Sequence, residues 1–536
     1  MNRREFVGLG MVMAGTVSGG QVMAAVGTDK KGAFKIEDAS IADLQAAMQS
    51  GKTSSQALVK AYLVRIKKID KSGPSINSII ELNPDALSIA AALDKERKLS
   101  GPRSPLHGIP VLIKDNIATA DKMETTAGSL AMVGVKPQRD AFVVEKLRAA
   151  GAVILGKTNL SEWANFRSTR SSSGWSGRGG LTKNPYALDR STSGSSSGSG
   201  ASIAASLAAV AVGTETDGSI ISPAAANSLV GIKPTVGLVS RSGIIPIAAS
   251  QDTAGPMARN VADAVALLAA LCGSDGRDDA TKEATSHALD YSKFLSKFLD
   301  TDGLNGARIG VIRANFGGRN DLASAVVEDA LKVLTAKGAV LMDVELPNAG
   351  KYGDSETEVL TYELKAGLNA YLAECIPGAP IRTLKELIEF NEKNRDRELK
   401  YFGQELFIRA EAKGGLDSKE YLDALANCRK LSREEGIDKI MAEQKLDAVV
   451  APSNGPTWIT DFIKGDNSGG GFSQAAAVAG YPHITVPAGY VAGLPIGISF
   501  VAGAWAEGTL IKLAYAFEQA TQHRRTPTFP GRVSMA

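Results

Sequence analysis

The sequence predicts an α/β protein whose core is assembled from segments along the whole chain. Two short apolar runs, residues 109–113 and 152–155, are bounded by glycine or polar residues, as buried parallel strands are. A helical pattern at residues 141–150 lies between them, which gives the strand–helix–strand order of an α/β fold. Strand-like runs return at residues 447–452 and 484–500. The 536 residues are therefore expected to build one large core.

Three helices are predicted before the first of these strands. Ser40 and Asp43 match a capping box that opens a helix of residues 40–50. A second helix follows residues 53–55 and carries apolar side chains at helical spacing along one face, namely Leu58, Tyr62, Ile66 and Ile69. A third helix is expected at residues 84–98, with the proline in its first turn.

The middle of the chain contains a polar tract and a long helical region. Residues 164–200 are rich in Ser, Gly, Arg and Asn, which alone would indicate a flexible linker. The tract leads directly into a small-residue helix at 201–208 and a strand at 209–213, so we place it within the core. Residues 281–445 are more polar and are expected to form a peripheral, more variable helical layer. The predicted domain spans residues 26–536.

Residues 1–25 resemble an export signal. Arg3 and Arg4 precede an apolar run at residues 6–17, and Val22-Met23-Ala24 fits a signal cleavage site. The run of about a dozen residues is shorter than the roughly 20 that cross a bilayer, and no later segment is long enough. We predict a bacterial protein that is periplasmic or secreted through twin-arginine export, with no membrane span in the mature protein. An ordinary Sec signal or a membrane anchor is the alternative.

Composition excludes several kinds of protein. The formal net charge is only +3, so the chain lacks the strongly basic character of nucleic-acid-binding proteins, and we expect no nucleic-acid partner. The three cysteines are far apart and give neither a disulfide framework nor a cysteine zinc site. The four histidines have no metal-ligand spacing, and no nucleotide-binding motif is complete. We therefore expect no metal and no cofactor.

A serine-rich stretch at residues 194–198 matches the G-x-S-x-G pattern of a nucleophile elbow, with Ser196 at its centre. Such an elbow follows a strand, whereas residues 188–193 are polar and unlike a strand. The elbow would also need a histidine, and the candidates are His287, His483 and His523. An esterase that uses Ser196 stays open as an alternative.

Ser219 is a second candidate nucleophile. It follows the strand predicted at residues 209–213, near the strand end where α/β folds bind their ligands. Gly218 allows a tight turn, and the successive N–H groups from Thr216 through Asp217 to Ser219 can converge on an oxyanion. A plain polar loop is the alternative interpretation.

Lys114 ends the apolar run at residues 109–113. Most lysines at strand ends are solvated, but a buried lysine loses its proton easily and can serve as a base. Because no histidine is well placed, Lys114 is the strongest candidate to activate a serine.

Four motifs in this order resemble the amidase signature family. They are GIPVLIKDN at residues 108–116, GKTN at 156–159, the Ser/Gly tract, and GSI at 218–220. The likeness continues to residues 480–487 and so covers nearly the whole predicted domain. It implies a single large domain with a central mixed β-sheet covered by helices on both faces. Within the family the chain looks most similar to peptide amidases, through residues 184–186, 214–219 and 237–246.

The resemblance also implies catalytic roles. Ser219 matches the acylated nucleophile and Lys114 the base. Ser195 lies 24 positions before Ser219 and matches the bridging serine, which follows a cis peptide bond in this family. Ser196 is the alternative bridging serine, because the surrounding residues depart from the family's Gly-Gly-Ser-Ser-Gly-Gly pattern. Residues 216–218 would form the loop that binds oxyanion and substrate, with Asp217 where the family usually has glycine.

We therefore expect an amidase that cleaves a carboxamide C–N bond through a serine acyl-enzyme. A small-molecule or peptide amide is the expected partner, C-terminal peptide amides are the favoured substrates, and ammonia or an amine leaves. The further alternatives are a catalytically silent binding protein and a glutamine-deamidating amidotransferase-like subunit. The acyl group, the amine and the oligomeric state are left open.

Overall fold

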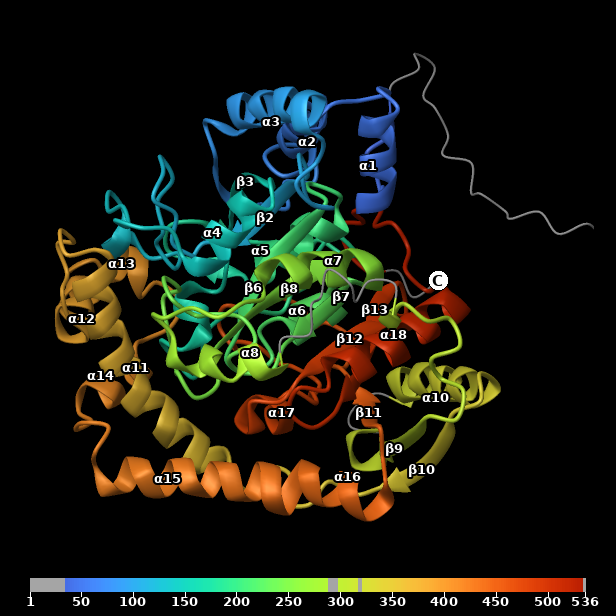
Figure 1. Cartoon of the computed structure of the whole chain (residues 1–536). Helices are drawn as coiled ribbons and strands as arrows, with labels where there is room; N and C mark the ends of the chain where they lie inside the picture. The colour runs from blue at the N-terminus through green and yellow to red at the C-terminus, as the bar shows by residue number, and fades with distance from the viewer. Residues whose placement is uncertain (1–33, 288–296, 317–320, 534–536) are drawn as a thin grey trace, which may run out of the picture. The chain divides into compact units, whose positions relative to one another are not determined.

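Eleven strands from the described residues (34–287, 297–316 and 321–533) form one mixed β-sheet in the computed structural model (Figure 1). In sheet order they are β1 (Ile79–Leu82), β3 (Val153–Thr158), β2 (Pro110–Lys114), β6 (Val210–Glu215), β8 (Thr253–Ala258), β7 (Val230–Lys233), β12 (His483–Val491), β13 (Leu494–Val501), β11 (Ala448–Pro452), β9 (Arg308–Ile312) and β10 (Val340–Val344). β2 is parallel to β3 and β6, and β9 is parallel to β10 and β11, whereas the other neighbours are antiparallel. One compact unit, Ile36–Ala536, contains the whole sheet, so the predicted fold class is confirmed.

Helices cover both faces of this sheet (Figure 1). The α-helices are α1 (Ile41–Gln49), α2 (Ser55–Ile69), α3 (Ala86–Ser100), α4 (Phe142–Ala149), α5 (Ser197–Ala204), α6 (Ile221–Ala226), α7 (Val261–Leu271), α8 (Ala284–His287), α10 (Asp321–Ala336), α11 (Gly353–Cys375), α12 (Leu384–Lys393), α13 (Arg395–Glu398), α14 (Glu405–Glu411), α15 (Lys419–Arg429), α16 (Asp438–Gln444), α17 (Gln474–Ala479) and α18 (Glu507–Thr521). None of the described helices combines enough length with enough apolar character to cross a lipid bilayer.

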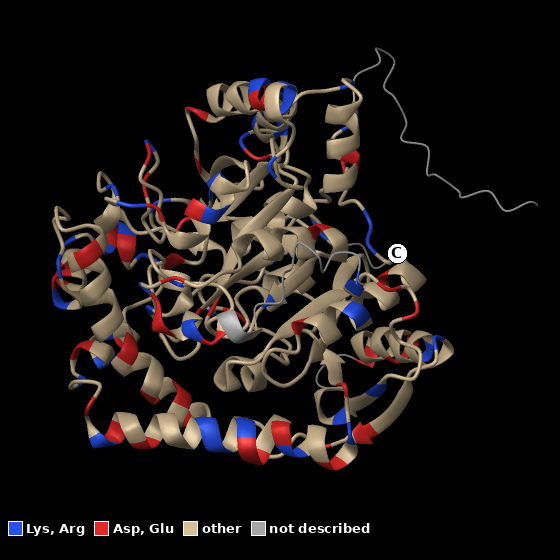
Figure 2. Ribbon diagram, viewed as in Figure 1, with Lys and Arg blue, Asp and Glu red and all other residues tan. Residues whose placement is uncertain are grey.

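The strands that carry the candidate site are buried along their full length. Every residue of β2, β3 and β6 is buried, which requires cover on both faces of the sheet. Figure 2 shows Lys, Arg, Asp and Glu mostly on the peripheral helices and loops, whereas the central strands are nearly all tan. Charged residues on these strands are therefore unusual, and Lys114 at the end of β2 is one of them.

The predicted helices before β2 are present. Ser40 and Asp43 form the capping box of α1, and Ser54 caps α2. One detail differs, because α3 begins at Ala86, so Pro84 precedes the helix instead of lying in its first turn. Asn83 donates its side-chain amide to the Ile154 carbonyl oxygen at 2.8 Å and accepts the N–H of Asp85 through Oδ1 at 2.9 Å, so a turn at residues 84–85 precedes the helix.

The Ser/Gly tract belongs to the core, as predicted, but its helix starts earlier than expected. α5 begins at Ser197 and ends at Ala204, whereas residues 201–208 were expected. A Cβ atom at Gly198 would lie 2.2 Å from the carbonyl oxygen of Ser78 and 2.4 Å from that of Asn159. Small residues are therefore needed here because the helix packs directly against backbone.

Residues 281–445 are mainly helical but are not only a peripheral layer. β9 and β10 lie within this range and complete one edge of the central sheet, which corrects the prediction. β9 is bound on one side to β11 and on the other to β10, whose side chains are half-buried or exposed. Both strands are only five residues long and stand among helical segments, so the sequence pattern did not reveal them.

Candidate active site

Lys114 is enclosed at the C-terminal end of β2. Its side chain has no exposed surface, and its Nζ lies 2.8 Å from Ser195 Oγ and 2.9 Å from Thr214 Oγ1. The Thr214 carbonyl oxygen is a third partner at 3.2 Å. Burial lowers the pKa of Lys114 to about 7, although the nearby carboxylates of Glu215 and Asp252 favour the charged form. A large share of Lys114 is therefore neutral near pH 7 and able to accept a proton.

Ser195 lies directly beside this amine. The peptide bond between Gly194 and Ser195 is cis, and Ser195 is fully buried. The carbonyl oxygen of Ser195 accepts the N–H of Ser161 at 3.1 Å, which anchors the segment to the loop after β3. A Cβ atom at Gly194 would lie 2.2 Å from Ser161 Oγ, so only glycine fits at that position.

Ser219 follows β6 and is 7% exposed, the accessibility expected of a nucleophile at the floor of a site. The N–H of Ser196 donates to the Ser219 carbonyl oxygen at 3.2 Å, which joins the two serine-bearing segments through their backbones. Within the described residues, the hydroxyl groups of Ser195 and Ser219 are not hydrogen-bonded to each other. Lys114 is thus joined to Ser195 by a side-chain hydrogen bond, and Ser219 is joined to the neighbouring Ser196 by a backbone hydrogen bond.

The loop from Thr216 to Ser219 has the open N–H groups that an oxyanion site needs. Gly218 has φ +75°, and a Cβ there would lie 2.8 Å from Ser473 Oγ. Among the described residues, the N–H groups of Thr216, Asp217 and Ser219 have no hydrogen-bond acceptor. Burial and the neighbouring Glu356 raise the pKa of Asp217 well above its usual range.

The next N–H groups are already occupied. Those of Ile220 and Ile221 donate to Glu215 Oε2 at 2.7 and 2.9 Å. Glu215 also accepts the N–H of Gly218, so it holds the chain on both sides of Ser219 in place and leaves the N–H groups of Thr216, Asp217 and Ser219 open to a ligand.

Ser196 has a different environment from that required by the esterase alternative. Its Oγ donates to the Thr214 carbonyl oxygen at 3.0 Å and accepts the Thr214 N–H at 3.2 Å, so it is bound to β6.

The histidines lie elsewhere. His483 contacts Ser499 Oγ at 2.6 Å, and burial lowers the pKa of that histidine to about 3. His287 stacks on Trp505, and His523 lies against Phe517. No described histidine contacts Ser196, and the nucleophile-elbow prediction lacks its base.

Two contact residues of the site were missed at the sequence level. Thr214 Oγ1 accepts hydrogen bonds from both Lys114 Nζ and Asn116 Nδ2, the latter at 3.0 Å. Asn116 belongs to the same motif as Lys114, and Thr214 precedes Thr216 by two positions, so both lay within segments already singled out. Nothing in the spacing showed that these segments meet, because they are 98 positions apart.

In the part of the chain that the structure describes, no group of three or more His, Cys, Asp or Glu side chains is placed to hold a metal ion.

Comparisons with known proteins agree on the family. The family described as Amidase matches residues 57–511. A protein of Arabidopsis thaliana named "Probable amidase" is 44% identical over 92% of each chain. The crystal structure of native peptide amidase from Stenotrophomonas maltophilia is 51% identical, covers 92% of this chain and 99% of that chain, and has a TM-score of 0.87. A glutamyl-tRNA(Gln) amidotransferase subunit from Pseudomonas fluorescens is 34% identical over 91% of this chain and 99% of that protein.

The predicted localisation is corrected by the curated relatives. A Schizosaccharomyces pombe protein named "Putative amidase" is 38% identical and covers 92% of this chain and 87% of that protein. An Arthroderma benhamiae protein of the same name is 36% identical and covers 90% of this chain and 81% of that protein. These plant and fungal relatives point away from a bacterial periplasmic or secreted protein with twin-arginine export. Residues 1–25, on which that prediction depended, lie outside the described residues.

Proposed function

Since the chain belongs to the amidase family, whose members hydrolyse amide C–N bonds, we propose that it removes the C-terminal amide group of peptides through an acyl-enzyme formed at Ser219. Lys114 is the base in this proposal, and Ser195 transfers the proton between the lysine and the nucleophile. Residues 216–219 bind the oxyanion.

The observation that carries the proposal is the 2.8 Å contact between Lys114 Nζ and Ser195 Oγ inside a fully buried site. A solvated lysine would be protonated at neutral pH and could not accept a proton. Because burial lowers the pKa of Lys114 to about 7, the neutral amine is available. This supports a serine activated by lysine where no histidine is within reach.

The reaction then proceeds in two stages. Lys114 accepts the proton of Ser195, Ser195 accepts that of Ser219, and Ser219 Oγ forms a bond to the substrate carbonyl carbon. The carbonyl oxygen becomes an oxyanion and accepts the free N–H groups of the 216–219 loop, each of which supplies about 3 kcal/mol when well placed.

The tetrahedral intermediate collapses when the C–N bond breaks. Ser195 gives its proton to the leaving nitrogen, which departs as ammonia, and protonated Lys114 returns a proton to Ser195. Water then attacks the ester carbonyl, gives its proton to the same relay and releases the free carboxylic acid. Ser219 Oγ–H is regenerated at the end of the cycle.

The substrate class is supported by the degree of similarity. The chain is 51% identical to a peptide amidase over nearly its whole length, compared with 34% for the amidotransferase protein. A peptide amide is therefore favoured over glutamine as the source of the amide.

Two measurements test this proposal. Ammonia release from a peptide amide, an aryl amide, glutamine and a short aliphatic amide, each at matched concentration, should be fastest with the peptide amide. Labelling by a serine-reactive phosphonate, followed by intact mass, should add one adduct to the wild type and to Ser196→Ala but none to Ser219→Ala. Preferential glutamine hydrolysis would contradict the substrate class, and labelling that persists in Ser219→Ala would contradict the nucleophile.

A further inference from the structure

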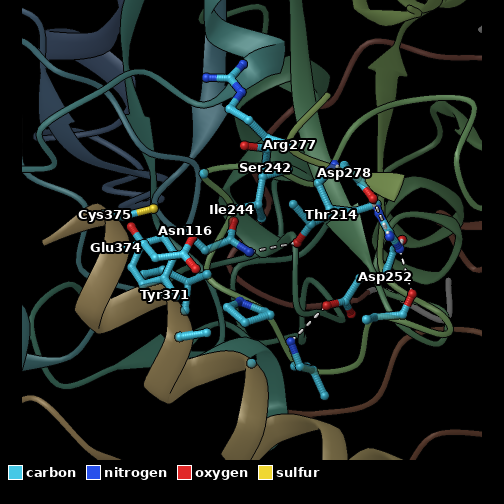
Figure 3. A pocket seen from close by; sticks show the side chains of 18 of the residues that line it. Asn116, Thr214, Ser242, Ile244, Asp252, Arg277, Asp278, Tyr371, Glu374 and Cys375 are labelled. Carbon is cyan, nitrogen blue, oxygen red and sulfur yellow. Dashed lines mark hydrogen bonds and ion pairs between the residues drawn. The ribbon is translucent and has the colours of Figure 1, made fainter. Parts of the chain in front are cut away.

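Thr214 lines a small cavity (Figure 3). Its volume is about 220 Å³, and Asn116, Thr214, Thr216 and Asp252 all line it. Figure 3 shows Asp252 near Thr214, with Asn116 hydrogen-bonded to Thr214. Thr214 is a direct partner of Lys114, so the cavity places an acidic side chain close to the proton relay.

The carboxylate of Asp252 connects two loops. Its Oδ1 accepts the hydroxyl of Thr216, the first residue of the oxyanion loop. Its Oδ2 accepts the N–H groups of Ile247 and Ala248 at 2.9 and 3.0 Å. Three hydrogen bonds therefore fix this carboxylate between the oxyanion loop and residues 247–248.

Several charged side chains surround this carboxylate and Lys114. Lys114 faces two acidic side chains, Glu215 and Asp252. Glu215 is committed to the N–H groups of Ile220 and Ile221 and faces Lys233. Asp252 faces Arg241, whose guanidinium is bound to the carboxylate of Asp278 on the same cavity. The other charged side chains that line the cavity are Arg139, Arg277 and Glu374.

We propose that Asp252 is a positioning residue for amide hydrolysis, with two tasks: it orients the oxyanion loop through Thr216, and its negative charge acts on Lys114, the partner of Thr214 on the same cavity. This inference rests on the proposed function and goes beyond it, because Asp252 lies outside the serine–serine–lysine relay. In the first task, the bond from Thr216 fixes the loop whose N–H groups bind the oxyanion. In the second, the carboxylate favours the protonated lysine and opposes the effect of burial.

The two tasks affect a profile of kcat/KM against pH differently. The acid limb of this profile is the range at low pH in which the rate rises as the base loses its proton. Asp252→Asn removes the charge, so the acid limb should move to lower pH by about 0.5–1 unit, the size expected for one charge at an effective dielectric constant of 20–40. The disturbed loop should also lower kcat by roughly tenfold or more. Thr216→Val removes the hydroxyl and keeps the carboxylate, so kcat should fall while the acid limb moves less than in Asp252→Asn.

Two further variants complete the design. Asp278→Asn is the matched control, since it removes a carboxylate of the same cavity that does not contact Thr216, and its acid limb and kcat should match the wild type. Arg241→Gln removes a cation that lowers the pKa of Asp252, which burial places at about 6, so more of Asp252 is protonated and the acid limb should move to lower pH, as in Asp252→Asn. This second change tests the charge effect even if Asp252→Asn fails to fold, and circular dichroism reports on folding in each case.

A folded Asp252→Asn variant with kcat within twofold of the wild type and an unchanged acid limb would overturn the inference. An unchanged limb in both Asp252→Asn and Arg241→Gln would refute the charge effect, and full activity of Thr216→Val would refute the loop effect. Failure of the proposed function is distinguishable, because Ser219→Ala and Lys114→Met would then stay active whatever the Asp252 variants do.

Discussion

The pH dependence of activity is the sharpest test of the buried lysine. Only neutral Lys114 can accept the proton from Ser195, so kcat/KM should rise with pH through the lysine pKa, which burial places at about 7. At pH 6 about 9% of the free enzyme would have a neutral lysine, and at pH 5 about 1%. The activity at pH 5 should therefore be about 100-fold below its plateau above pH 8.

The assay measures initial rates of ammonia release from a peptide amide between pH 5 and 9, at substrate concentrations well below KM. Lys114→Met should lower the plateau by at least about 1000-fold, since it removes the base and with it the activation of both serines. The rate of phosphonate labelling of Ser219, measured over the same pH range, should depend on pH in the same way. This measurement shows whether the pH dependence arises in the acylation step.

Lys157 provides the matched control. It is also fully buried, its pKa is lowered to about 8 by burial, and its Nζ donates to the Ile117 carbonyl oxygen at 2.6 Å and to Thr125 Oγ1 at 2.8 Å. It contacts neither candidate serine, so Lys157→Gln should keep the acid limb near pH 7. A flat profile from pH 5 to 9 in the wild type, or an acid limb that moves only in Lys157→Gln, would refute the assignment of Lys114 as the base.

Three other substitutions test the structure directly. The folded pKa of Lys114 lies below its unfolded value of 10.5, so its burial costs stability that grows as pH falls from about 10 to 7, up to about 5 kcal/mol. After allowance for the lost hydrogen bonds, the free energy of unfolding of Lys114→Met in urea should exceed that of the wild type by about 1–3 kcal/mol at pH 7 and should not exceed it at pH 10. A variant that is less stable than the wild type by the same amount at both pH values would contradict this. Gly218→Ala should lower kcat more than 10-fold, because the backbone conformation at φ +75° costs alanine about 1–2 kcal/mol and the added Cβ would meet Ser473. Unchanged rates of phosphonate labelling would count against a role of this loop. Arg167→Met should destabilise the protein by about 3–5 kcal/mol, since Arg167 is enclosed with the carboxylates of Glu162 and Glu398, and a melting temperature within 1–2 °C of the wild type would show that this cluster contributes little.

Local sequence patterns determined the helices and central strands near the site. The capping box at Ser40, the apolar run that ends at Lys114 and the strand that precedes Ser219 are short-range signals, and each predicted its element to within a few residues. Residue chemistry also favoured Lys114 as the candidate base, since no histidine had a suitable context. β9 and β10 escaped prediction because each is only five residues long and lies among helical segments; β9 is a buried interior strand, and β10 lies at the sheet edge.

Sequence alone determined which residue types were available for catalysis, and the tertiary structure decided which of them meet. Lys114 precedes Ser195 by 81 positions and Thr214 by 100. β2 and β6 are neighbours in the sheet, which brings Lys114 within 3 Å of Thr214, and backbone hydrogen bonds from Ser161 and Ser196 hold the Ser195 segment beside them. Burial is likewise a property of the folded chain, so the lowered pKa of Lys114 could not be read from its neighbours in sequence. Asp252 became significant only once the fold placed it beside Thr216 and the cavity, because hydrogen bonds and charge effects depend on distances in space and not along the chain.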